Sequence, residues 1–191
     1  MNCPRFSDPA RPAALRALAT SLVAAFASAA HADCGPVISA YAKADATKRF
    51  AMFDVDSLAQ TPKGDAFMVV IGEVAYTQNI VRKGALQFEI EGYKTGRYNS
   101  GFEARSLKGR EEKGEVRSEP LGERKVGTEA ATGYQIRRND KGVQPDPHAI
   151  HMWASRATGL PLFHGMGSDD GGLRWVFGPG VMEPVPGKIG K

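Results

Sequence analysis

Apolar and polar residues alternate along most of this chain, and a period of two residues is typical of β-strands with one buried face. The most strand-like run is Phe67-Met68-Val69-Val70-Ile71, followed by Gly72-Glu73, which has the Gly-first pattern of a tight hairpin turn. Further strands are expected at residues 49–55, 73–81, 84–93, 117–121, 132–138, 149–155, 160–164 and 173–177. Short turn sequences separate these strands, so we expect a mostly antiparallel sheet.

Two segments follow a helical period instead. Residues 37–47 place Val37, Tyr41 and Ala44 at helical spacing without an internal Gly or Pro. Residues 99–112 carry a shorter stripe and predict a mostly exposed helix. This order of elements predicts an α+β domain in which a curved, mostly antiparallel sheet, a half-open barrel, packs around one or two helices.

The clearest hairpin in the sequence joins the strands expected at residues 149–155 and 160–164, and two registers are possible for it. A two-residue turn at Thr158-Gly159 would place Trp153 opposite His164. A three-residue turn that includes Ala157 would place Trp153 opposite Phe163 instead. The first register predicts a partly polar face turned to solvent, and the second predicts an aromatic wall suited to an apolar ligand.

The first 32 residues have the pattern of a secretory signal peptide. Arg5, Arg11 and Arg16 form a basic lead, an uncharged run follows, and Ala30-His31-Ala32 has the small-x-small pattern of a cleavage site. The apolar run is too short to anchor the chain in a bilayer, so we expect cleavage before Asp33 and export to the periplasm. The expected organisation is a signal peptide at 1–32, a single domain at 33–180 and a loose tail at 181–191.

The charge balance argues against nucleic acid as a dedicated partner. The whole chain has a formal charge of +4, and loss of residues 1–32 lowers it to +2 because three Arg and one Asp leave. Nucleic-acid binding usually requires a concentrated basic face, whereas the dense cluster at 108–113 mixes both signs. We therefore expect no nucleic-acid partner, and no membrane-spanning segment in the mature protein.

Cys34 is the one cysteine that would remain after cleavage, which excludes an internal disulfide. It can be a small half-buried residue without a role, a partner in an intermolecular disulfide, or a free reactive thiol. Lipid attachment is disfavoured because His31, Ala32 and Asp33 do not form a lipobox.

The chain does not show the sequence patterns of common catalytic and metal sites. His148 and His151 are three residues apart, and on a strand an odd separation points the two rings to opposite faces. Gly165-Met166-Gly167-Ser168 has the wrong spacing for a nucleophile elbow. Asp169-Asp170-Gly171-Gly172 lacks the later ligands of a calcium loop. We expect no metal, no cofactor and no catalytic residue.

Several predicted strands carry large apolar residues on both faces, and one small helix cannot cover so long a sheet. The concave side is therefore expected to keep an apolar cavity able to hold an acyl chain. The candidate ligand-binding residues are Phe50, Met52, Val69, Ile71, Tyr76, Tyr134, Ile136, Trp153, Phe163, Trp175 and Phe177. The alternative is an ordinary core filled by the same side chains.

A family resemblance appears at the C-terminal hairpin. The stretch Met152-Trp153-Ala154-Ser155-Arg156-Ala157-Thr158-Gly159-Leu160-Pro161 resembles the strand, turn and strand of the periplasmic outer-membrane lipoprotein-carrier superfamily and its secreted relatives. Gly133-Tyr134-Gln135-Ile136 and the helix after the signal peptide fit the order of that family. The resemblance implies a half-open antiparallel sheet that wraps helices and receives lipid chains. The chain departs from the family in its shorter length, its missing lipobox and its segment 84–113.

Three functions remain open at this point. The first is a non-enzymatic cell-envelope protein that binds a lipid, an acylated protein or another apolar ligand. The second is a structural or assembly factor whose core is filled and which binds no small ligand. The third is a small periplasmic enzyme, although the sequence shows no catalytic motif that favours it. A void lined by the candidate residues would support the first function, and close packing would support the second.

Overall fold

The computed structural model describes residues 33–139 and 149–185, which lie in the compact unit His31–Lys191. Its first half contains α1 (Gly35–Thr47), β1 (Arg49–Val55), β2 (Met68–Ile71), β3 (Val74–Arg82) and β4 (Phe88–Arg97). Its second half contains α2 (Phe102–Glu112), β5 (Val116–Val126), β6 (Glu129–Arg138), β7 (Ile150–Ser155), β8 (Pro161–Met166) and β9 (Gly172–Phe177).

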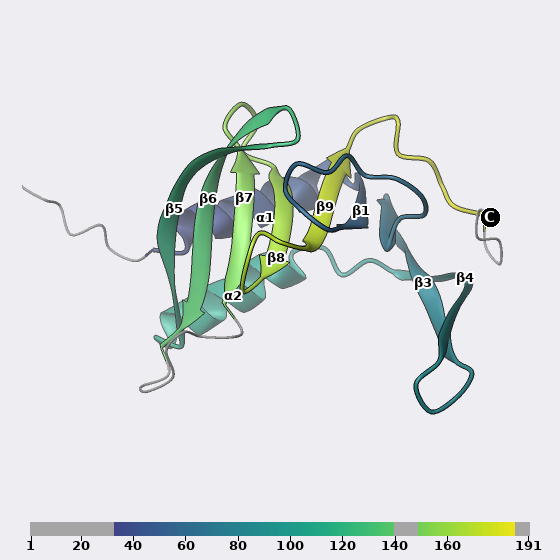
Figure 1. Cartoon of the computed structure of the whole chain (residues 1–191). Coiled ribbons are helices and arrows are strands. Elements are labelled where there is room, and N and C mark those ends of the chain that lie inside the picture. The colour runs from purple at the N-terminus through teal and green to yellow at the C-terminus, as the bar shows by residue number, and fades with distance from the viewer. Residues whose placement is uncertain (1–32, 140–148, 186–191) are drawn as a thin grey trace, which may run out of the picture. The chain divides into compact units, whose positions relative to one another are not determined.

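The nine strands form one antiparallel sheet in the order β4-β3-β2-β1-β9-β8-β7-β6-β5. β1 and β9 pair in its centre and join the two strand meanders. Both helices lie on one face of the curved sheet (Figure 1), and the edge strands β4 and β5 do not pair with each other. The predicted α+β fold with a curved, unclosed antiparallel sheet is confirmed. Among the described residues, neither helix has the length and the apolar composition that a membrane-spanning helix needs.

The helix-covered face holds the largest core cluster. α1 packs Val37, Ala40, Tyr41 and Ala44 against the sheet, as its helical spacing predicts. Pro36 in the first turn favours the start of the helix, because a proline there costs no backbone hydrogen bond. The opposite face, which we call the outer face, holds two smaller clusters, to which the loop residues Leu58, Ala66 and Val181 contribute.

Several predicted boundaries need correction. β4 begins at Phe88 and not at Gly84, because Lys83 N–H bonds to the Gln87 carbonyl (2.9 Å) and closes a turn there. The Arg82 guanidinium stabilises this turn by donating to two of its carbonyl oxygens. β5 and β6 extend further than predicted and meet at a turn after Val126. The polar residues of β5 lie on an exposed edge, where no apolar alternation is needed.

The C-terminal hairpin has neither of the two expected turns. Its loop is longer, and Ser155 N–H donates to the Leu160 carbonyl (2.8 Å) across it. A bulge between this point and Trp153 then restores the second of the two registers, with Trp153 opposite Phe163. The tight turn at Gly72-Glu73 is confirmed, with Gly72 at a positive φ of 63°.

Part of the segment expected to form a loose tail is held against the sheet. Val181 is buried, and the Arg49 guanidinium donates to its carbonyl oxygen at 2.9 and 3.1 Å. The Tyr76 hydroxyl donates to the Glu183 carboxylate. Residues 186–191 lie outside the described residues.

Packing of Trp153 requires a residue without a side chain on the neighbouring strand. Gly133 pairs with Trp153, and a Cβ atom at Gly133 would meet the indole ring at 2.6 Å. We expect Gly133→Ala to lower the free energy of unfolding by about 1–3 kcal/mol, because the ring would have to move. Denaturant unfolding followed by circular dichroism measures this.

Gly96→Ala is the matched control. Gly96 also lies within a strand, but a Cβ atom there would meet nothing within 4 Å. Its substitution should change stability by less than about 0.5 kcal/mol. Equal effects of the two substitutions would contradict the packing of Trp153 over Gly133.

Candidate functional site

The main candidate site is a cleft of about 500 Å³ on the helix-covered face, at the border of the helix layer. We call it the apolar cleft. It lies between the two helices and strands β1, β2, β8 and β9. Its lining is Tyr41, Met52, Phe67, Met68, Tyr98, Asn99, Phe102, Glu103, His164, Leu173 and Trp175. Its size and mainly apolar lining are those of sites that bind small ligands.

Aromatic rings form the floor of the apolar cleft. The Trp175 ring lies 5.0 Å from Phe50 and 6.0 Å from Phe177, measured between ring centroids, and Tyr41 lies 6.3 Å from it. Trp175, Tyr41 and Met52 are buried, whereas Asn99, Phe102 and Glu103 are exposed. The cleft therefore has an apolar floor and a mouth with polar groups.

One polar pair lies within the apolar cleft. The Tyr41 hydroxyl and His164 Nδ1 are 3.2 Å apart. Burial lowers the pKa of His164 and raises the pKa of Tyr41, because a low-dielectric site disfavours both charged forms. Both groups are therefore uncharged at neutral pH, which suits a cleft that holds an apolar molecule. The buried Trp175 indole N–H has no hydrogen-bond acceptor among the described residues.

Asp45 fixes the mouth of the cleft. Its carboxylate accepts a hydrogen bond from Gly101 N–H (2.7 Å) and another from the Tyr98 hydroxyl. These bonds tie the last turn of α1 to the start of α2 and so position Phe102 and Glu103. Although the Glu103 side chain is exposed, neighbouring groups partly desolvate its carboxylate, and this desolvation and the like charge of Asp45 raise its pKa.

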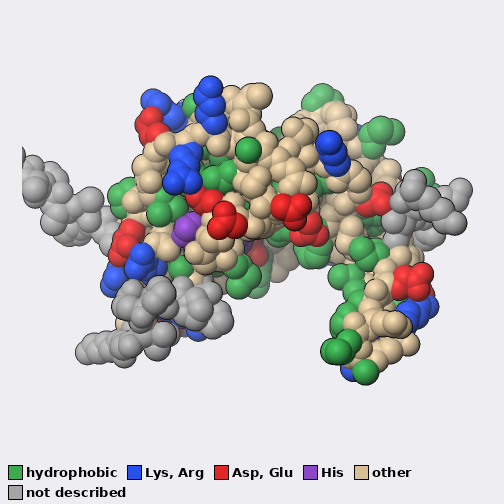
Figure 2. Space-filling view, in the orientation of Figure 1, with side chains coloured by type: hydrophobic (Ala, Val, Ile, Leu, Met, Phe, Trp, Pro, Cys, Tyr) green, Lys and Arg blue, Asp and Glu red, His purple; other side chains and the backbone are tan. Residues whose placement is uncertain are grey.

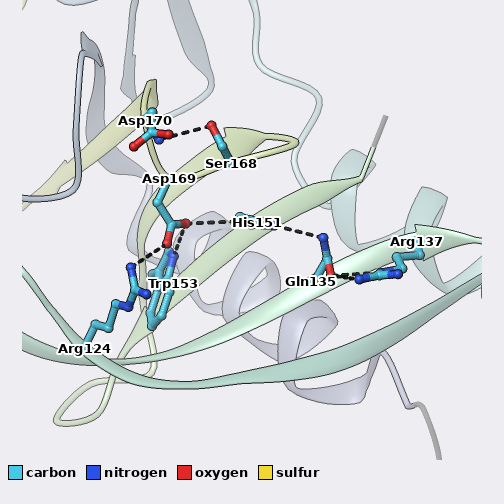
Figure 3. Close-up of polar contacts among 8 residues, drawn as sticks. All are labelled: Arg124, Gln135, Arg137, His151, Trp153, Ser168, Asp169 and Asp170. Carbon is cyan, nitrogen blue, oxygen red and sulfur yellow. Dashed lines mark hydrogen bonds and ion pairs between the residues drawn. The ribbon is translucent and has the colours of Figure 1, made fainter. Parts of the chain in front are cut away.

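A polar network occupies the outer face around Asp169 (Figure 3). Asp169 Oδ1 accepts hydrogen bonds from Trp153 Nε1 (2.8 Å) and His151 Nδ1 (2.9 Å). Asp169 Oδ2 accepts another from Arg124 (3.2 Å), whose guanidinium lies 5.8 Å from the centre of the Trp153 ring. The side chains of His151 and Asp169 are only 12 % and 16 % exposed, so these bonds are largely shielded from water.

The second ring nitrogen of His151 is also bonded. Gln135 Oε1 accepts from Arg137 (2.8 Å), so the Gln135 amide nitrogen is the atom that donates to His151 Nε2 (3.0 Å). A His–Asp pair acts as a general base only when the outer ring nitrogen can take a proton from a substrate or nucleophile. Because Gln135 occupies that nitrogen, we interpret the network as structural: it holds the β8–β9 turn on the sheet.

The eleven candidate residues of the sequence divide between the two faces of the sheet. The helix-covered face has Phe50, Met52, Tyr134, Ile136, Trp175 and Phe177. The outer face has Val69, Ile71, Tyr76, Trp153 and Phe163.

Of these eleven residues, Met52 and Trp175 line the apolar cleft. The Trp153–Phe163 pair, expected to form a ligand-facing aromatic wall in this register, is instead fully buried in the outer-face core.

Sequence reasoning missed most of the residues at the mouth of the cleft. Phe67 and Met68 were recognised as strand residues, but the strand alternation does not tell which of them faces a void. Phe102 was the available signal in the sequence, because it is a large apolar residue on a mostly polar predicted helix. In the structure it is 55 % exposed. His148 lies outside the described residues, so the expected geometry of the His148–His151 pair stays a prediction.

Cys34 is a buried, free thiol directly before α1. Its backbone N–H donates to Glu111 Oε1 (2.6 Å), which joins the start of α1 to the last turn of α2. Burial and the nearby Glu111 carboxylate raise the pKa of the thiol to about 11. Of the alternatives considered for Cys34, this environment favours a packed residue over a reactive thiol.

Comparisons with protein-family models, with curated proteins and with solved structures find no match to this chain. The function is therefore inferred from its residues and their geometry alone.

Burial of Trp153 leads to a direct test of whether it belongs to the core. We expect Trp153→Ala to lower the free energy of unfolding by about 3–5 kcal/mol, the usual loss for a large buried aromatic residue. Trp153→Phe keeps one six-membered aromatic ring but removes the part of the indole that donates to Asp169, so its loss should be about 1–3 kcal/mol. Denaturant unfolding compares the two variants, and a loss below 1 kcal/mol for Trp153→Ala would contradict a core role.

Proposed function

We propose that this chain is a non-enzymatic, exported protein of the cell envelope that binds the acyl chain of a lipid or acylated protein in the apolar cleft. The observation that carries the proposal is the combination of an aromatic floor with a polar, exposed mouth in a cleft of about 500 Å³. An acyl chain would pack on Met52, Met68 and Trp175, and its polar head would remain beside Asn99 and Glu103.

The chemistry of the lining supports an apolar ligand over a charged one. Tyr41 and His164 are held uncharged by burial, and the rest of the floor is mainly apolar. Burial of apolar ligand surface contributes about 25 cal/mol for each Å² removed from water. Binding would therefore depend on chain length more than on the identity of the head.

The pattern of residues 1–32 supports the cellular location. A basic lead, an uncharged apolar run and a small-x-small end together favour export through a cleaved signal peptide.

A structural role without a small ligand is the second candidate. It is favoured by the nine candidate residues that pack into the three core clusters without lining the cleft. The two candidates differ in whether the apolar cleft takes a ligand, and binding measurements separate them.

Binding of a fluorescent sixteen-carbon fatty acid tests the cleft. We expect the wild-type protein to bind it and Met68→Asp to bind it at least about tenfold more weakly, since an acyl chain would have to lie against a carboxylate, and 1.4 kcal/mol is a factor of ten. Fluorescence titration at equal protein concentrations measures both.

Met166→Asp is the matched control, because Met166 is 68 % exposed and lies outside the cleft. It should bind the probe as the wild-type protein does. A wild-type protein that binds no such probe would contradict the carrier function and favour the structural one.

Export has its own test. N-terminal sequencing of the protein recovered from the periplasm should give a chain that begins at Asp33. A retained Met1, or a lipid-modified Cys34, would contradict the proposed export.

A further inference from the structure

Strand β4 forms one free edge of the sheet. It pairs with β3 on one side, and no strand pairs with its other side in the described part of the chain. It is ten residues long, and eight of these residues are exposed. A long exposed edge presents unpaired N–H and C=O groups to another chain unless it is protected.

The two edges of the sheet differ in protection. The opposite edge strand, β5, contains Pro120 next to a bulge, contacts α2, and bonds through Ser118 to the Asp33 carbonyl. Proline and bulges are common means of blocking strand addition at an edge. β4 has a bulge but no proline, and in the described residues no helix contacts it as extensively as α2 contacts β5.

The charges of β4 are separated along the strand. Its first half carries Glu89 and Glu91, and its second half carries Lys94 and Arg97. A second β4 that runs antiparallel would place the acidic half of each strand along the basic half of the other, whereas a parallel copy would place like charges together. Lys83 contacts both Glu89 and Glu91 within the same chain. Its single positive charge balances only one of these two carboxylates.

The bulge in β4 brings Glu91 and Lys94 onto the same face. Between the pairs Gln78–Tyr93 and Ile80–Ile90, β4 has one residue more than β3, so its side-chain alternation shifts by one. Lys94 lies opposite Thr77 and Glu89 opposite Val81, both odd-numbered positions of β3. Glu91 shares Lys83 with Glu89 and lies on that face as well.

We propose that two copies of this chain form a two-fold symmetric dimer through antiparallel pairing of β4 with β4. The axis passes between Gly92 and Tyr93, so that Glu91 of each copy lies opposite Lys94 of the other. Both side chains of each pair are then on one face of the joined sheet, as a two-fold axis perpendicular to the sheet requires. Such an isologous interface continues the sheet by main-chain hydrogen bonds.

Exposed apolar side chains agree with a second copy at this edge. Phe88 is 66 % and Ile90 41 % exposed, and both belong to the arm formed by the outer parts of β3 and β4. Hydrophobic side chains gather mainly on one side of this arm, and charged ones on the other (Figure 2). In the proposed register, Phe88 lies beside the stem of the second copy's Arg97 and Ile90 beside its Thr95, so both lose contact with water.

Charge-reversal substitutions at Glu91 and Lys94 test the dimer. Sedimentation velocity over a range of protein concentrations measures dimerisation. The wild-type protein should show a concentration-dependent dimer. Glu91→Lys alone or Lys94→Glu alone should weaken dimerisation at least about tenfold, since each homodimer would hold two repulsive pairs. An equimolar mixture of the two variants should dimerise again, because every pair in the heterodimer is then attractive. Recovery in the mixture also shows that both variants are folded.

Glu123→Lys is the matched control, because Glu123 is an exposed glutamate on the opposite edge strand. It should leave dimerisation unchanged. A wild-type protein that is monomeric at all concentrations would overturn the proposal. A dimer that persists in both β4 variants, or that is lost in Glu123→Lys, would also overturn it. The same holds if the mixture of the two β4 variants does not form a dimer.

Discussion

Two short helices have to cover one face of a nine-stranded sheet, and much of the structure follows from this constraint. α1 has thirteen residues and is about 20 Å long at 1.5 Å per residue. Nine strands at a spacing of about 4.8 Å make a sheet almost 40 Å wide. Neither helix is long enough to span that width, and the apolar cleft lies at the border of the helix layer.

The outer face has no helix and is covered by other means. Loop residues such as Leu58 and Val181 pack on it, and Asp169 at the β8–β9 turn bonds to Trp153, His151 and Arg124. Three donors thus satisfy the Asp169 carboxylate oxygens in a site that is mostly shielded from water. The polar network thus holds the β8–β9 turn over Trp153 on a face that no helix covers.

Local periodicity was sufficient to predict most of the fold. The helical spacing of Val37, Tyr41 and Ala44 identified α1, and the glycine at position 72 identified the tight turn between β2 and β3. The start of β4 was misplaced because Arg82 stabilises a turn through contacts that no local pattern reveals. The long polar end of β5 was missed because an exposed edge strand needs no apolar alternation.

The sequence predicted an apolar cavity on one face of the sheet, but not most of the residues that line the apolar cleft. Alternation shows that Trp153 and Trp175 are both strand residues, but it does not show which face a helix covers. That depends on long-range pairing, which buries Trp153 in the outer-face core and places Trp175 beside the cleft. The cleft mouth depends on Asp45, whose contacts with Tyr98 and Gly101 join segments that are more than fifty residues apart.

We propose that the apolar cleft holds an acyl chain in the cell. Native mass spectrometry of the protein purified from the cells that produce it is the test. We expect a species heavier than the polypeptide by the mass of one acylated molecule, and its loss in Met68→Asp but not in Met166→Asp. A protein that carries only its polypeptide mass, under conditions that preserve other lipid complexes, would contradict the claim.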